Sequence, residues 1–187
     1  AYAPHIEAVF GQVPRHDPRY QPFTLADQGQ RGRQPLLIAL EHLLKLPHSR
    51  FAVSDILDLL DVPALRARFG IKEADVPILQ RWIDGAGVRW GLNEQQRESL
   101  DMPAGLEQNT WRFGMRRMLL GYAAGQGPEL NGIEPYDEVS GLEAALAGPL
   151  LTLLDHLEIA REDLQQPATP VLWVERLQSL LKVFFRP

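Results

Sequence analysis

Cysteine is absent from the 187 residues, lysine occurs only three times, and acids outnumber bases, for a formal net charge of -5 at pH 7. Without cysteine the chain has neither disulfides nor thiolate metal sites, which fits a reducing compartment, and we expect a cytoplasmic protein. The acidic balance gives no general attraction for nucleic acid, so a DNA contact would need a local patch. No apolar run reaches the roughly 18 residues that cross a bilayer, so we expect no membrane partner.

Motifs for nucleotide and metal chemistry are also missing. A Walker A loop needs a Gly-Lys pair, but Lys45, Lys72 and Lys182 follow Leu, Ile and Leu. The five histidines form neither an HExxH pair nor a close cluster. His42 and His48 flank a predicted helix end at a spacing that should point them apart. We therefore expect no cofactor-binding and no metal-binding residues.

Serine and aspartate candidates for catalysis have simpler structural interpretations. Ser140 precedes a glycine, but the GxSxG elbow is incomplete, and Glu143 three residues later matches a helix capping box instead. Asp55, Asp58 and Asp61 lie three apart on one predicted helix face, where carboxylates can hold Mg²⁺ or act as acid and base. The first two also stand near a helix start, where the helix dipole favours acids. We predict no catalytic residue in this chain.

The spacing of apolar residues predicts a mainly α fold. Helical periodicity covers residues 36–44, 54–60, 63–69, 72–84, 110–124, 142–157 and 171–185. Ser54 is the candidate N-cap of the second helix, and Pro63 and Gly70 are typical of the start and end of the third. Residues 2–10 predict a short helix, and residues 22–26, inside a Gly- and Pro-rich stretch, a single short strand. At most, then, the sequence predicts a minor β element near the N-terminus.

Arginine is the positive signal, because it outnumbers lysine sixteen to three. Guanidinium groups fit phosphates and stack on aromatic rings, as in channels for single-stranded DNA. Four arginines close to tryptophans are the candidate nucleic-acid-binding residues: Arg89, Arg112, Arg116 and Arg117. The competing interpretation is that they pair with the chain's own acids, among them Asp84, Glu107 and the acidic loop 126–138.

Four stretches in this order together resemble one family. They are LPHSRFAVSDILDLLDVPALRARFGI (46–71), RWIDGAGVRWGL (81–92), NTWRFGMRRMLLGYA (109–123) and PYDEVSGL (135–142). They resemble an interior segment of the gamma subunit, the RecC-type chain, of exodeoxyribonuclease V. The opening AYAPHIEAVFG resembles the helix after a strand in that subunit's second motor-like domain. Related stretches occur in the beta subunit, so the homologous part of that subunit is an alternative.

The resemblance implies a subunit built like a superfamily 1 helicase that has lost its ATPase motifs. It implies residues 1–33 as the remnant of a motor-like (2A-like) core and loop, and residues 34–187 as a helical accessory (2B-like) domain. The implied partners are DNA and the beta and alpha subunits, and the implied process is the trimming of double-strand DNA ends for recombinational repair.

ATP and Mg²⁺ belong to the implied parent complex, an ATP-dependent exodeoxyribonuclease (a hydrolase), and not to this segment. Two other functions remain open. One is a pure inter-subunit scaffold that never touches DNA. The other is a small hydrolase that uses Asp55 and Asp58.

Overall fold

The computed structural model describes Asp17, Tyr20 and residues 34–185. The helix expected over residues 2–10 and the strand expected over residues 22–26 lie outside the described residues. The chain divides into two compact units, Ala1–Ile38 and Ala39–Pro187.

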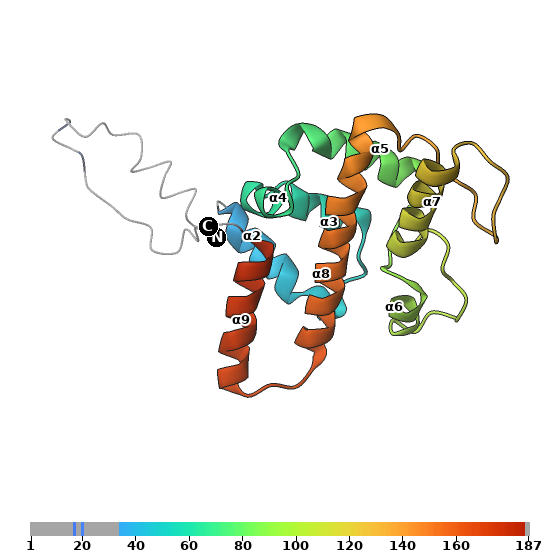
Figure 1. Cartoon of the computed structure of the whole chain (residues 1–187). Helices are drawn as coiled ribbons and strands as arrows, with labels where there is room; N and C mark the ends of the chain where they lie inside the picture. The colour runs from blue at the N-terminus through green and yellow to red at the C-terminus, as the bar shows by residue number, and fades with distance from the viewer. Residues whose placement is uncertain (1–16, 18–19, 21–33, 186–187) are drawn as a thin grey trace. The chain divides into compact units, whose positions relative to one another are not determined.

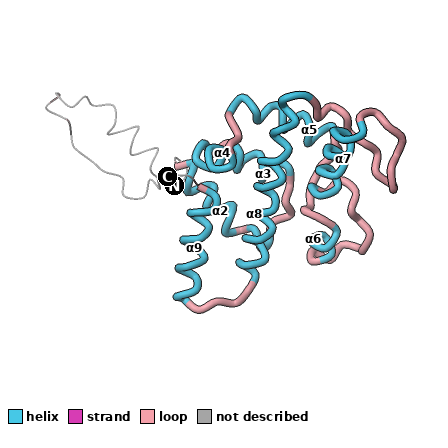
Figure 2. The backbone as a smooth tube through the Cα atoms, viewed as in Figure 1, coloured by secondary structure: helices cyan, strands magenta, loops and turns pink. Residues whose placement is uncertain are grey.

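The described residues are mainly helical, which confirms the predicted fold class (Figure 2). The α-helices are α2 (Pro35–Leu44), α3 (Val53–Leu60), α4 (Pro63–Phe69), α5 (Val76–Gly85), α6 (Glu94–Glu98), α7 (Trp111–Ala124), α8 (Ala147–Gln165) and α9 (Pro170–Phe184). Three 3-10 turns join them: η2 (Leu46–His48), η3 (Glu73–Asp75) and η4 (Gly141–Leu146). Within this part of the chain, the β structure is one isolated bridge between Leu130 and Ile133.

Helix α8 packs against more of the described elements than any other helix does. It contacts α4, α7, α9, η2 and η4. Leu150, Leu153, Leu154 and Leu157 recur at helical spacing and are fully buried, so this face of α8 forms part of the core. Helix α9 returns beside α8 after a short loop (Figure 1). The hydroxyl of Thr169 accepts from the Leu172 N–H at 3.4 Å and caps the start of α9.

Some of the helix ends predicted from the sequence are confirmed and others are wrong. Helix α4 runs from Pro63 to Phe69 and closes on Gly70 at φ 71°, as predicted. The cap predicted at Ser54 is wrong, because α3 already begins at Val53 after an N-cap at Ala52. The hydroxyl of Ser54 bonds to the neighbouring Asp55 carboxylate instead, at 3.4 Å.

The capping box predicted at Ser140 is also wrong. Ser140 does occupy the N-cap position of η4, but its side chain makes no capping hydrogen bond. The carboxylate of Glu143 lies 3.6 Å from the Arg81 guanidinium and so forms an ion pair with α5. Glu143 therefore pairs with Arg81 of α5 and not with the backbone at Ser140.

Three segments, residues 50–53, 89–92 and 109–112, exchange backbone hydrogen bonds and form a junction that includes the first residues of α3 and α7. The Gly91 N–H donates to the Arg50 carbonyl at 2.8 Å, and the Trp111 N–H donates to the Gly91 carbonyl at 2.9 Å. The Trp111 indole N–H donates to the Phe51 carbonyl, also at 2.9 Å. Because Trp111 and Phe51 are both fully buried, this junction belongs to the core.

The segment that follows α7 returns across that helix at a glycine. The Tyr136 N–H donates to the Arg117 carbonyl at 3.0 Å, and the Tyr136 hydroxyl donates to the Glu138 carboxylate, also at 3.0 Å. Burial first, and then the Glu138 carboxylate, raise the pKa of Tyr136 to about 12, so the hydroxyl keeps its proton at neutral pH. A Cβ on Gly121 would stand 1.8 Å from the Tyr136 carbonyl oxygen. The close approach therefore requires glycine.

We expect Gly121→Ala to destabilise the fold by about 2 kcal/mol or more, because the added methyl group meets backbone that cannot rotate away. The matched control is Gly148→Ala in α8. An added Cβ there meets no atom within 4 Å apart from its chain neighbours, and we expect a change of less than about 1 kcal/mol, because Pro149 offsets the helix preference of alanine. Urea unfolding of both variants measures the two changes. Equal effects, or a neutral Gly121→Ala, would contradict the packing at Gly121.

Candidate nucleic-acid interface

Helix α7 carries three of the four candidate arginines and no acidic residue. It begins after Thr110, whose hydroxyl accepts from the Phe113 N–H at 3.2 Å and caps the helix. Trp111, Met115 and Met118 are buried and direct one face of the helix into the core. The arginines at positions 112, 116 and 117 therefore project from the sides of that face.

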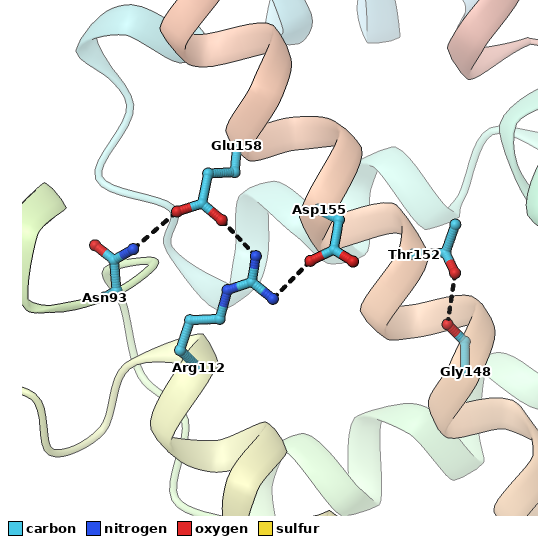
Figure 3. Close-up of polar contacts among 6 residues, drawn as sticks. All are labelled: Asn93, Arg112, Gly148, Thr152, Asp155 and Glu158. Carbon is cyan, nitrogen blue, oxygen red and sulfur yellow. Dashed lines mark hydrogen bonds and ion pairs between the residues drawn. The ribbon is translucent and has the colours of Figure 1, made fainter.

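Arg112 joins α7 to α8, as Figure 3 shows. One end of its guanidinium lies 2.6 Å from the Asp155 carboxylate, and the other bonds to Glu158. The Asn93 side-chain amide donates to the second oxygen of Glu158 at 2.8 Å, which adds the N-cap of α6 to the cluster. Burial opposes the charge of Arg112, but the hydrogen bonds and charges of Glu158 and Asp155 outweigh it and raise its pKa.

Arg117 is the most buried of the four, with 17% of its side chain exposed. Its Nη1 donates to the Ala86 carbonyl at 2.8 Å and its Nε donates to the Glu134 carbonyl at 2.9 Å. The Glu134 carboxylate lies 3.3 Å from its Nη2. Arg117 therefore holds the loop that leads to Tyr136 and the end of α5 against α7.

Arg116 and Arg89 are the exposed members, with 45% and 61% of their side chains accessible. Arg116 pairs with Glu107, and Arg89 lies 3.8 Å from the Asp84 carboxylate. Exposed pairs of this kind contribute little free energy, so these two guanidinium groups can exchange partners readily. Arg112 thus pairs with two carboxylates and each of the other three arginines with one, and no two of the four share a partner. Their binding to nucleic acid stays a prediction.

Arg97 was not among the predicted site residues, although it organises the same region. Its side chain is buried and donates to three carbonyl oxygens, those of Leu106 at 2.7 Å, Gln108 at 2.8 Å and Trp90 at 2.7 Å. Its guanidinium also lies 4.3 Å from the centre of the Trp90 ring, a cation–π contact. Burial lowers its pKa. From the sequence, arginines near tryptophans are candidate DNA-binding groups. At Trp90 the ring is instead in contact with Arg97 of the same chain.

The described residues contain no group of three or more His, Asp or Glu side chains that could hold a metal ion. None of the helices in this part of the chain is long and apolar enough to cross a membrane. His42 and His48 were expected to point apart. Both nevertheless line the same hollow, with the 3-10 turn η2 between them in the sequence.

Comparison with known proteins gives one consistent relationship. Residues 33–187 match the family described as "RecBCD enzyme subunit RecC fourth domain". The chain is 44% identical to RecBCD enzyme subunit RecC of Escherichia coli over all of its own length and 16% of the relative. It is 37% identical to RecC of Haemophilus influenzae over 98% of its length and again 16% of the relative. The chain therefore spans about a sixth of the length of these relatives.

We expect Arg112→Ala to lower the free energy of unfolding by about 1–2 kcal/mol, because it leaves two carboxylates of α8 without their partly buried partner. Arg112→Lys should recover only part of the loss, since lysine lacks the fork that reaches both carboxylates. Arg116→Ala, at an exposed pair, should cost less than about 0.5 kcal/mol. Chemical unfolding gives all three values. A cost at Arg112 no larger than that at Arg116 would show that the contact to α8 is not structural.

Proposed function

The chain belongs to the RecC family, and from this premise we propose that it forms a non-catalytic helical domain of the gamma subunit of a RecBCD helicase–nuclease, exodeoxyribonuclease V. In this proposal the parent complex processes double-strand DNA ends for recombinational repair in the cytoplasm. ATP and Mg²⁺ act in that complex and not in this segment. The partners are DNA and the beta and alpha subunits.

The proposed arrangement follows a superfamily 1 helicase. Residues 34–187 would be the helical accessory (2B-like) domain, and residues 1–33 would be the remnant of a motor-like (2A-like) core. The matched relatives named above are RecC subunits, which favours the gamma subunit over the homologous part of the beta subunit.

One observation carries the non-catalytic proposal: the charged groups of the candidate site bind each other. The arginines of α7 are engaged by Asp155, Glu158, Glu107 and Glu134, so α7, α8 and the neighbouring loops are tied together. A body tied in this way suits a domain that acts by shape and subunit packing. These ion pairs are also sufficient for the alternative function, a scaffold between subunits that does not contact DNA.

Direct DNA contact is the second candidate, and the exposure of Arg89 and Arg116 favours it. Both have weak, solvent-exposed ion pairs that a phosphate can replace. Arg112 and Arg117 would contribute to DNA binding only indirectly, because their side chains hold α7 in place.

Asp55→Asn/Asp58→Asn in the full-length protein, assembled with its partner subunits, tests the absence of catalysis. We expect ATP hydrolysis and DNA degradation to stay within about twofold of wild type, because Asp55 lies in the first turn of α3 and the two carboxylates belong to no group of the described residues that could hold a metal ion. Loss of a catalytic acid or base would lower the rate by about 100-fold or more. A loss of that size, in a complex that assembles and melts normally, would revive the hydrolase alternative.

A further inference from the structure

A hollow of about 440 Å³ lies between the C-terminal end of α2 and the start of α3. The turn η2 and the loop that follows it form one wall, and α3 forms the other. Leu46, Ile56 and Leu59 are its apolar floor. The volume falls in the range of pockets that hold small ligands or parts of larger ones.

The rim of this hollow is basic. Its lining includes two histidines, a lysine and an arginine against a single carboxylate, that of Asp55. We call the four residues His42, Lys45, His48 and Arg50 the basic rim. This balance is unusual in a chain whose net charge is -5.

The basic rim differs from the α7 arginines because its charges are not neutralised internally. Within the described residues, none of the four side chains makes a hydrogen bond or an ion pair. Lys45, His48 and Arg50 are exposed and His42 is half-buried, so their N–H groups are accessible to a ligand. The two cations of the rim, Lys45 and Arg50, have no carboxylate partner among the described residues, and an anion bound in the hollow would supply one.

The wall that carries Arg50 is held firmly. Phe51, the next residue, has a φ of 53° although it is not glycine, a conformation that costs free energy unless its surroundings enforce it. Its carbonyl accepts from the Trp111 indole, and its N–H donates to the Ser49 hydroxyl at 2.9 Å. The Gln96 side-chain amide donates to the Ser49 carbonyl at 3.1 Å. A wall fixed at several points presents the rim in one geometry, as a binding site requires.

We propose that the basic rim binds a phosphate ester of nucleic acid, a site separate from the α7 arginines. The inference rests on the proposed function, since that function supplies DNA as the polyanion. Lysine and arginine side chains are the usual phosphate donors, and histidine adds further N–H groups. A compact hollow with four donors at its rim suits one concentrated anionic group better than the spaced carboxylates of an acidic peptide.

The test compares Lys45→Ala/Arg50→Ala with Arg68→Ala/Lys182→Ala in the full-length protein with its partner subunits. The control pair removes the same charge, and within the described residues its two side chains are also exposed and make no hydrogen bond or ion pair, but neither lines the hollow. Fluorescence anisotropy measures affinity for a labelled twelve-nucleotide oligothymidylate at several salt concentrations. We expect the magnitude of the salt slope to fall by roughly 0.7 for each phosphate contact that the rim pair loses, and so by about 0.7 to 1.4, and to stay unchanged for the control.

Hydrogen exchange locates the contact, and competition identifies the ligand. Oligonucleotide should protect the backbone of residues 42–59 in wild type and not in the rim variant. Thymidine monophosphate as competitor separates a free nucleotide from a strand, and polyglutamate separates phosphate from carboxylate. Equal slopes for rim and control variants would overturn the inference and leave the proposed function intact. Equal competition by polyglutamate would overturn it in favour of an acidic protein partner. No binding by wild type at all would contradict the DNA part of the proposed function as well.

Discussion

A buried hydrogen bond between the Trp111 indole and the Phe51 carbonyl is the contact on which the described unit most depends. It joins residues sixty positions apart at 2.9 Å, and both side chains are fully buried. If either group lost its partner, an unpaired polar atom would remain in the core, at a cost of about 1–3 kcal/mol. The same bond keeps Phe51 at a positive φ, and around it the segments of Arg50, Gly91 and Trp111 exchange their backbone hydrogen bonds.

Two arginines next to the junction differ in their surroundings: one is paired with carboxylates and the other is not. On its α7 side, the residue after Trp111 is Arg112, which bonds to Asp155 and Glu158 and fixes α7 to α8. On its α3 side, the residue before Phe51 is Arg50, which faces a hollow and has no partner within the described residues. The same structural element therefore orders an arginine that serves stability and one that is available for a ligand. This division explains how an acidic domain can carry a local anion site.

Much of the fold could be predicted, because helices depend on local periodicity and on residues such as Pro63 and Gly70 that mark their ends. Helix α6 was not predicted, since five residues are too short to show a periodicity. The partners of Arg112 could not be predicted, because Asp155 and Glu158 lie more than forty residues away and any of the chain's acids could have taken their place. The shared hollow of His42 and His48 depends on a 3-10 turn, which has no clear sequence signal.

The most direct test of this account is hydrogen exchange in the full-length protein carrying Trp111→Phe. Phenylalanine keeps an aromatic ring in the core but removes the N–H that bonds to Phe51. The account predicts that the amides of Val53 and Gly91 exchange about tenfold faster or more, while the interior amides of α8 change little. Protection of residues 50–53 and 89–92 that stays as in wild type would show that the indole bond does not hold the junction, and the central claim would fail.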